Sequence, residues 1–305
     1  MAERSSPVRA WLRAARPLAH ANIAPPLLLG QALAYAAGAG FDPGLAAVAF
    51  GFGVLDHLAI VFANDYADRE ADALNGAPTP LSGGSRVLVD GSIAPARLGA
   101  AALVVAGLLL AGSAAAGLLL SRPWLPALAA AALALLQLYS FAPGRASYRG
   151  FGEILQGLGV GLVLPLVGWY VQSGSIARVP WSAFAPLVVL GFVSNILTAL
   201  PDAPADAAAD KASWPVRRGQ ARARRDAMVL LGVGLLLITQ VGPTLPPVWL
   251  GVVLGPPAMA AVAALRWIRR ADAERRADCL RFVTLAAGAI TLVHVTWSTA
   301  LFLRG

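Results

Sequence analysis

The chain has 305 residues, of which 58% are apolar and only 13% charged, and its formal net charge is +8. Because soluble domains carry charges on about a quarter of their residues, this composition excludes a disordered or fibrous chain and argues against a soluble enzyme. The single cysteine, Cys279, excludes a disulfide framework and a cysteine-based metal site. The sequence therefore indicates a protein embedded in a membrane.

Nine segments contain about 20 mainly apolar residues each, the length that an α-helix needs to cross the hydrocarbon core of a bilayer. They cover residues 19–38, 44–64, 98–120, 123–142, 151–172, 181–200, 227–243, 246–266 and 280–302. The first run is longer than the apolar core of a typical signal peptide, so we interpret it as a retained helix. The predicted fold class is all-α: a polytopic membrane protein with nine transmembrane helices, in one domain over residues 1–305.

The lysines and arginines orient this predicted topology. All but Arg122, Arg178 and Arg304 fall in the N-terminal segment or in and beside the loops that follow the second, fourth, sixth and eighth spans. Because positive residues concentrate on the cytoplasmic side, we expect a cytoplasmic N-terminus, in a bacterial inner membrane. This topology accounts for the net charge, so no nucleic-acid partner is expected, and the basic run 217–225 is expected to face anionic lipid.

The loop after the second span begins with closely spaced polar and acidic residues. Asn64, Asp68 and Asp72, here called the first acidic ladder, follow one another at four-residue spacing. On a helix, this spacing places their oxygen atoms on one face. Like charges at that spacing repel each other, so a helix without a ligand would lose stability.

A second acidic ladder, formed by Asp202, Asp206 and Asp210, follows the sixth span at the same spacing. Hard oxygen ligands at this density suit Mg²⁺, which often keeps several waters and bridges to substrate phosphates. Two ladders that face each other could hold the diphosphate of an allylic prenyl donor, whose leaving group Mg²⁺ would neutralise. The alternative is a solvated loop whose acids balance nearby arginines, but two ladders at matched spacing favour a binding site.

The ladders also carry a resemblance. The stretch NDYADREAD (residues 64–72) resembles the NDxxDxxxD motif of the UbiA superfamily of intramembrane prenyltransferases, and the pair Asp202 and Asp206 resembles its second, DxxxD motif. The nine predicted spans, with both motifs on the cytoplasmic side, are similar to that family's helices bundled around a central cavity. Within the superfamily, LDHLAIVFANDY (55–66), LSGGSRVLVDGSI (81–93) and YRGFGE (148–153) most resemble 1,4-dihydroxy-2-naphthoate polyprenyltransferases.

The resemblance implies that the ladder residues are the catalytic metal-binding groups. The side chains that it assigns to Mg²⁺, or to the support of its ligands, are Asn64, Asp65, Asp68 and Asp72 for one ion and Asp202 and Asp206 for the other.

The second ladder departs from the family pattern. Asp210 stands where relatives carry a glycine, and Pro201 and Pro204 flank the start of the ladder. Because proline is tolerated only in the first helical turn, the helix must begin close to Asp202. If it begins later, Asp206 and Asp210 form the metal-binding pair instead.

Further residues are assigned by the same resemblance. Arg86, Arg145 and Lys211 would contact the diphosphate, and Tyr139 would lie beside the forming carbocation, where an electron-rich ring stabilises positive charge. Asn22, at the start of the first span, either forms a hydrogen bond in the cavity or simply begins the helix.

Asp56 and His57 lie inside the second span, two helical turns before Asn64. A carboxylate within a membrane span is costly and usually marks a functional interior. Either residue could deprotonate or orient a hydroxylated aromatic ring and so make a ring carbon nucleophilic. The alternative for Asp56 is a structural carboxylate paired with a neighbouring polar group.

These inferences predict a Mg²⁺-dependent enzyme that joins a polyprenyl diphosphate to an aromatic quinone precursor and releases diphosphate. Terpene cyclisation and prenyl transfer to haem, to a chlorophyll-type acceptor or to a lipid ether remain open within the superfamily. The rival from another class is an ion-coupled transporter. Transporters place their sites near the membrane midplane, whereas these acids lie at one face.

Overall fold

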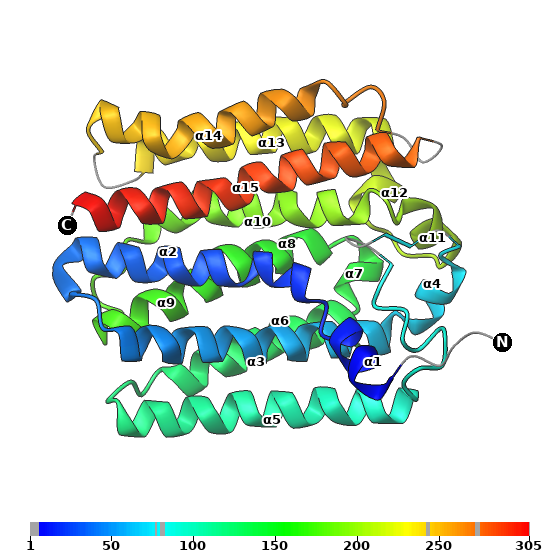
Figure 1. Cartoon of the computed structure of the whole chain (residues 1–305), viewed down its shortest axis with the longest axis horizontal. Coiled ribbons are helices and arrows are strands. Elements are labelled where there is room, and N and C mark those ends of the chain that lie inside the picture. The colour runs from blue at the N-terminus through cyan, green and yellow to red at the C-terminus, as the bar shows by residue number, and fades with distance from the viewer. Residues whose placement is uncertain (1–5, 77, 80–82, 242–244, 272–274, 305) are drawn as a thin grey trace.

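The computed structural model describes residues 6–76, 78–79, 83–241, 245–271 and 275–304, and the elements of this part of the chain are helices. Positions 81–82 of the 81–93 motif and 242–243 of the predicted span 227–243 lie outside the described residues. The long helices lie side by side along the long axis of the molecule (Figure 1). The all-α prediction is confirmed for the described residues.

Six helical segments of the described chain are long and apolar enough to cross a membrane. They are α3 (Pro43–Ala67), α5 (Pro95–Leu119), the continuous run Gly152–Ser173, α10 (Trp181–Ala199), α14 (Pro247–Leu265) and α15 (Arg276–Arg304). The run Gly152–Ser173 consists of α8 (Gly152–Leu158), the π-helical turn η3 (Gly159–Val163) and α9 (Leu164–Ser173). These segments identify an integral membrane protein.

The other three predicted spans form shorter or more polar helices. The first divides into a 3₁₀ turn, η1 (Pro17–Asn22), then α2 (Ala24–Ala34) and the π-helical turn η2 (Tyr35–Ala39), which includes Gly38 at a φ of 87°. The fourth is α6 (Leu125–Ser140), and the seventh overlaps α13 (Gln220–Val241), which begins in the basic run. Within the described residues, six of the nine predicted spans are therefore long and apolar enough to cross a membrane.

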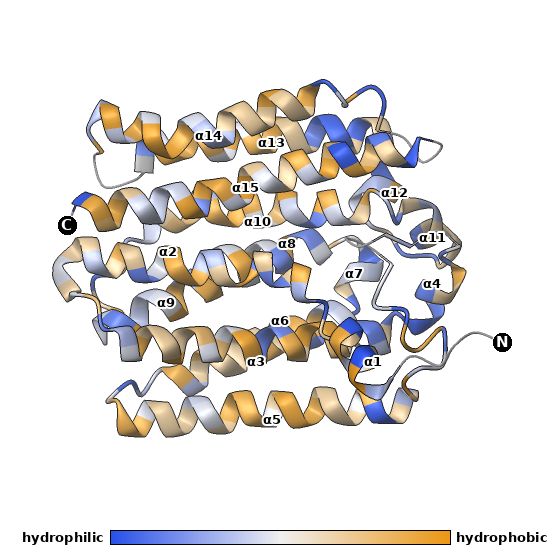
Figure 2. Ribbon diagram, in the orientation of Figure 1, coloured by the Kyte–Doolittle hydropathy of each residue, from blue (hydrophilic) through white to orange (hydrophobic). Residues whose placement is uncertain are grey.

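The short helices α1 (Pro7–Ala14), α4 (Arg69–Leu74), α11 (Ala203–Ala208) and α12 (Trp214–Arg218) gather at one end of the bundle (Figure 1). α7 (Ala146–Arg149) lies near the same end. Hydrophilic residues collect there, whereas the long helices are mainly hydrophobic along their length (Figure 2). This polar end carries both acidic ladders.

Close packing of α2 against α9 fixes one wall of the bundle. A Cβ atom added to Gly30 would overlap the carbonyl oxygen of Pro165, and one added to Gly168 would overlap that of Leu27. In a membrane, where lipid tails are as apolar as the helices, such close backbone approach supplies much of the packing energy. Ile23, directly before α2, and Leu164, the first residue of α9, line the central cavity.

Candidate active site

The first acidic ladder spans the junction of α3 and α4. Asp68 has a backbone φ of −93° and ψ of 7° between the two helices. Even so, the amide of Asp68 bonds to the carbonyl of Asn64 and the amide of Asp72 to that of Asp68, both at 2.8 Å. The helical spacing predicted for the ladder is therefore kept through the junction.

The second acidic ladder extends from the residue before α11 to a residue beyond the end of that helix. Asp202 immediately precedes α11, with Pro204 as the second helical residue, and the amide of Asp206 bonds to the carbonyl of Asp202 at 2.8 Å. The helix thus begins close to Asp202, as its predicted pairing with Asp206 requires. Asp210 is exposed, lies outside the cavity lining and has a φ of 54°, the left-handed conformation for which glycine is best suited.

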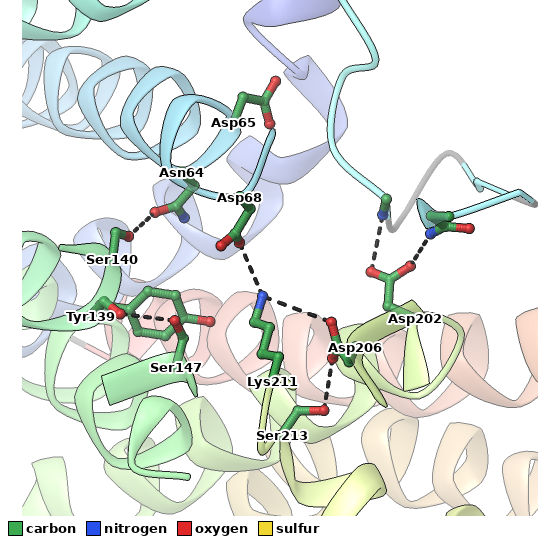
Figure 3. A network of polar contacts seen from close by, with 12 residues as sticks. Asn64, Asp65, Asp68, Tyr139, Ser140, Ser147, Asp202, Asp206, Lys211 and Ser213 are labelled. Carbon is green, nitrogen blue, oxygen red and sulfur yellow. Dashed lines mark hydrogen bonds and ion pairs between the residues drawn. The ribbon is translucent and has the colours of Figure 1, made fainter. Parts of the chain in front are cut away.

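Lys211 links the two ladders (Figure 3). Its Nζ lies 3.0 Å from Oδ2 of Asp68 and 3.9 Å from Oδ1 of Asp206. Burial alone would lower the pKa of Lys211, but the carboxylates of Asp68 and Asp206 raise it well above its ordinary value. The structure therefore brings together two acids that are more than a hundred residues apart in the sequence.

Side chains that the sequence did not single out hold the ladder residues in place. Ser140 donates a hydrogen bond to Asn64 Oδ1 at 2.5 Å, and Ser213 donates one to Asp206 Oδ2 at 2.7 Å (Figure 3). These hydroxyls come from the end of α6 and from the turn before α12. Each leaves its ladder partner an oxygen lone pair for a further ligand.

The loop after α4 holds two more of the acids. Asp202 accepts a hydrogen bond from Asn75 Nδ2 at 2.8 Å and one from the backbone amide of Gly83 at 3.0 Å. Asp65 accepts bonds from the backbone amide of Ser85, at 3.1 Å, and from its hydroxyl. The loop thus engages the carboxylates of both Asp202 and Asp65, and the supporting role of Asp65 stays a prediction.

A cavity of about 850 Å³ extends from the ladders into the bundle. Its walls come from α3, α6, α8, η3, α10 and α15 as well as from the polar end. The apolar side chains that line it include Ile60, Leu135, Leu136, Val160, Val163, Leu164 and Val283. One cavity therefore joins a cluster of acids to an apolar interior.

Asp56 and His57 both line this cavity and are both buried. Oδ1 of Asp56 has no hydrogen-bond partner within the described part of the chain. His57 Nε2 lies 2.7 Å from the carbonyl oxygen of Ala15, and its ring makes an edge contact with His20. Asp56 thus has an uncommitted oxygen in the cavity, whereas one nitrogen of His57 is used to hold the segment between α1 and η1.

The residues predicted to contact diphosphate are distributed unevenly. Arg86 lines the cavity, and its guanidinium donates to the carbonyl oxygens of Asp72 and Asn75 at the end of α4. Asn22 also lines the cavity, where its Oδ1 accepts a hydrogen bond from Ser194. Arg145 is outside the cavity lining, and its guanidinium lies 4.0 Å above the ring of Tyr148.

Tyr139 lines the cavity beside Lys211 and Ser147 (Figure 3). The hydroxyl of Ser147 donates to the backbone carbonyl of Tyr139 at 2.9 Å. The phenol of Tyr139 accepts a hydrogen bond from Nδ2 of Asn195 at 3.1 Å. The ring is therefore held near Lys211 and Asp68 of the first ladder.

The crowding of these carboxyls changes their acidity. Burial, together with the charges of Asp65 and Asp68, raises the pKa of Asp72 to about 7. Burial also raises the pKa of Asp206 to about 6, against the opposing effect of Lys211. A raised carboxyl pKa means that the ionised form is unfavourable in this environment, which a bound cation would reverse.

The donor set fits Mg²⁺ if part of the coordination comes from elsewhere. Oδ1 of Asp68 is buried and has no hydrogen-bond partner in the described structure. Within the described ranges, no three acidic or histidine side chains are close enough to enclose a metal ion by themselves. Mg²⁺ usually keeps waters and binds through one or two carboxylates plus substrate phosphates, so two sparse ladders suit a metal that arrives with a diphosphate.

We expect the metal-free protein to lose stability as the pH rises from 5.5 to 8. The pKa of Asp72 is about 7 in the folded chain against an ordinary value of 3.8, so the folded state binds more protons over this range. The expected loss is about 2 kcal/mol for this carboxyl, measured as a lower melting temperature in detergent with EDTA. Asp72→Asn should flatten the pH dependence, and a melting temperature that instead rises with pH would contradict this prediction.

Comparison with known proteins gives consistent matches over most of the chain. The sequence model of the UbiA prenyltransferase family matches residues 23–302. A 1,4-dihydroxy-2-naphthoate octaprenyltransferase of Mycobacterium tuberculosis is 34% identical over 262 residues, covering 84% of this chain and 86% of the relative. The Mycobacterium leprae protein of the same name is 30% identical over 247 residues, covering 80% and 79%.

A solved structure shares the fold. A UbiA homolog from Archaeoglobus fulgidus bound to GPP and Mg²⁺ superposes with a TM-score of 0.65 at 18% identity, covering 96% of this chain and 99% of that chain. At this identity, the likeness establishes a common arrangement of helices.

Proposed function

The chain belongs to the UbiA prenyltransferase family, and from this premise we propose that it transfers a polyprenyl group from a polyprenyl diphosphate to 1,4-dihydroxy-2-naphthoate. The acceptor is suggested by the two mycobacterial relatives, both named 1,4-dihydroxy-2-naphthoate octaprenyltransferase. The donor class is supported by the fold neighbour that is bound to GPP and Mg²⁺. The proposed reaction is an electrophilic aromatic substitution that releases diphosphate.

The observation that carries this proposal is the convergence of the two acidic ladders at one cavity. Asp68 and Asp206 share Lys211, and the cavity continues from them to an apolar interior. A diphosphate is anionic and a prenyl chain is apolar, so one cavity offers each part of the donor a matching environment. Lys211 can exchange its carboxylate partners for a phosphate oxygen, because all three of its donors rotate with the ammonium group.

The ladder residues hold the metal ions in this proposal. Asn64, Asp68 and Asp72 bind one Mg²⁺ and Asp202 with Asp206 the other, and Asp210 is left out because it is exposed outside the cavity lining. Bound Mg²⁺ neutralises the charge that develops on the leaving diphosphate.

The reaction itself takes place beside Tyr139 and Asp56. When the C–O bond of the donor breaks, diphosphate leaves with the electron pair, and the ring of Tyr139 stabilises the allylic cation. The free oxygen of Asp56 accepts the hydroxyl proton of the acceptor, which makes the ring carbon nucleophilic. A carbon–carbon bond then forms, and loss of the ring proton restores aromaticity. His57 positions the segment before α2 through its bond to Ala15.

We further propose nine spans, a cytoplasmic N-terminus and an active site on the cytoplasmic side of a bacterial inner membrane. The ladders lie at the end of the bundle that carries α1 and α12 (Figure 1). Basic residues lie in these helices and in the segment of α13 that follows α12, as expected on the cytoplasmic face.

Diphosphate release by the purified protein in lipid vesicles tests the proposed function. Geranylgeranyl diphosphate is offered with and without Mg²⁺, and with 1,4-dihydroxy-2-naphthoate, 4-hydroxybenzoate or no acceptor. We expect release that requires both Mg²⁺ and the naphthoate, with a prenylated product identified by mass spectrometry. Release that needs Mg²⁺ but no acceptor would assign a cyclase instead, and no release from folded protein would contradict prenyl transfer.

A further inference from the structure

The ring of Tyr139 is a hydroxylated aromatic group, which is the same class of nucleophile as the proposed acceptor. A phenol reacts with a carbocation at its oxygen or at the two ring carbons next to the hydroxyl, Cε1 and Cε2. A ring placed to stabilise an allylic cation is therefore also placed to be alkylated by it. The contacts around Tyr139 determine which of these three positions a carbocation can reach.

Two of the three nucleophilic positions of this phenol are covered. Cε2 packs against Gly152 so closely that a Cβ atom added there would lie 3.1 Å from it. The oxygen accepts a hydrogen bond from Nδ2 of Asn195 at 3.1 Å. That bond draws on the lone-pair density of the phenol oxygen and holds the ring at a fixed rotation.

Asn195 is itself fixed in orientation. It is buried in α10, seven residues before Asp202. Its Nδ2 also donates to Oε1 of Gln156 at 2.8 Å. An asparagine amide has two hydrogens, and these two bonds use both, so the amide nitrogen is kept on the side of Tyr139.

We propose that Asn195 is a positioning residue that holds Tyr139 so that its ring stabilises the allylic cation without being alkylated by it. The inference rests on the proposed function. When Asn195 no longer donates, the phenol rotates and becomes a competing nucleophile. The donor C–O bond breaks, diphosphate leaves with the electron pair, and the cation forms a C–O or C–C bond to Tyr139. The phenol proton, or the ring proton in the second case, passes to a diphosphate oxygen.

The test measures the share of ionised donor that becomes bonded to the protein instead of the acceptor, and free prenol, which forms when water captures the cation, is measured separately. Asn195→Leu removes the donor at similar volume. Thr198→Val is the matched control, because the Thr198 hydroxyl lies one turn further along α10 and donates only to the carbonyls of residues 194 and 195. Prenol is quantified by chromatography, and the protein adduct by intact mass with peptide mapping to Tyr139.

We expect Asn195→Leu to raise this share at least about fivefold over wild type and Thr198→Val, and to lower kcat more than it changes the KM of the donor. The rise should disappear when Asn195→Leu is combined with Tyr139→Phe, which has no phenol oxygen. A share in Asn195→Leu equal to that of Thr198→Val, or a rise that persists in the Tyr139→Phe background, would overturn the proposal. If Asn195→Leu does not fold, Gln156→Met is tested in its place. This variant removes the acceptor of the second Asn195 amide hydrogen, so the amide can rotate away from Tyr139. The same two results would then overturn the proposal.

The result is separable from failure of the proposed function. If wild-type protein releases no diphosphate from any donor, prenyl transfer fails. If wild-type protein turns over and Asn195→Leu behaves as Thr198→Val does, only the role of Asn195 fails. Asp68→Asn combined with Asn195→Leu should show neither prenol nor adduct, because the donor is then not ionised.

Discussion

Replacing Asp68 or Asp206 with asparagine is expected to lower kcat by about 100- to 1000-fold. The two carboxylates come from different ladders and meet at Lys211, 3.0 Å and 3.9 Å from its Nζ. Each substitution removes one negative charge and keeps the shape of the side chain, so loss of metal binding and of leaving-group stabilisation should dominate. The measurement is Mg²⁺-dependent diphosphate release in vesicles.

Glu70→Gln is the matched control for the first ladder. Glu70 lies between Asp68 and Asp72 in the sequence, but its side chain is 86% exposed and pairs with Arg69 at the surface. We expect this variant to keep wild-type turnover. Full activity in both Asp68→Asn and Asp206→Asn, with folding checked by gel filtration in detergent, would refute the two-metal mechanism.

The same assay decides how the second ladder is used. Asp202 lines the cavity, whereas Asp210 is exposed outside it. Asp202→Asn should therefore cost far more activity than Asp210→Asn. The reverse order would restore the alternative pairing of Asp206 with Asp210.

The acidic ladders were predictable because their geometry is local. A spacing of four residues fixes a common helical face wherever a helix forms, and the backbone bonds from Asp68 to Asn64 and from Asp206 to Asp202 keep that face. The family match then confirmed the class of enzyme. Whether Asp202 or Asp210 pairs with Asp206 was left open by the sequence, since it depends on where α11 begins.

The partners of the ladder residues could not be predicted, because they are distant in the sequence. Asn75 and Asp202 are 127 residues apart, and Ser140 and Asn64 are 76 apart. A single serine or asparagine carries no sequence signal that identifies its partner. Only the packing of the helices brings these groups within hydrogen-bond distance.

The prediction of membrane spans was incomplete for the same reason, because contacts between distant segments are not visible in the sequence. Counting apolar residues begins the seventh span at 227, but α13 begins at Gln220 and includes the second part of the basic run, with Arg222, Arg224 and Arg225. Within that run, Arg224 is buried, and its guanidinium donates to the carbonyls of Ile268 and Ala271. It does not face lipid as the sequence suggested, because it donates to backbone carbonyls in the turn beyond the end of α14.

Replacing Asp56 with asparagine is expected to lower prenyl transfer about 100-fold or more, within the usual range for loss of a general base. Asp56 is buried in the cavity wall, and its Oδ1 has no partner within the described residues. Burying an uncommitted carboxylate oxygen is unfavourable unless a ligand satisfies it. The hydroxyl of an aromatic acceptor would do so, and the same contact would remove its proton.

The pH dependence separates this role from a structural one. An asparagine cannot take the acceptor proton, so Asp56→Asn should regain activity as rising pH ionises the acceptor in solution, whereas the wild-type rate should change much less over the same range. The KM of the donor should stay within about twofold, because Asp56 acts on the other substrate. If Asp56→Asn loses activity equally at every pH and its melting temperature falls, the carboxylate supports the fold. The base would then have to be sought among the other groups that line the cavity, with Nδ1 of His57 first.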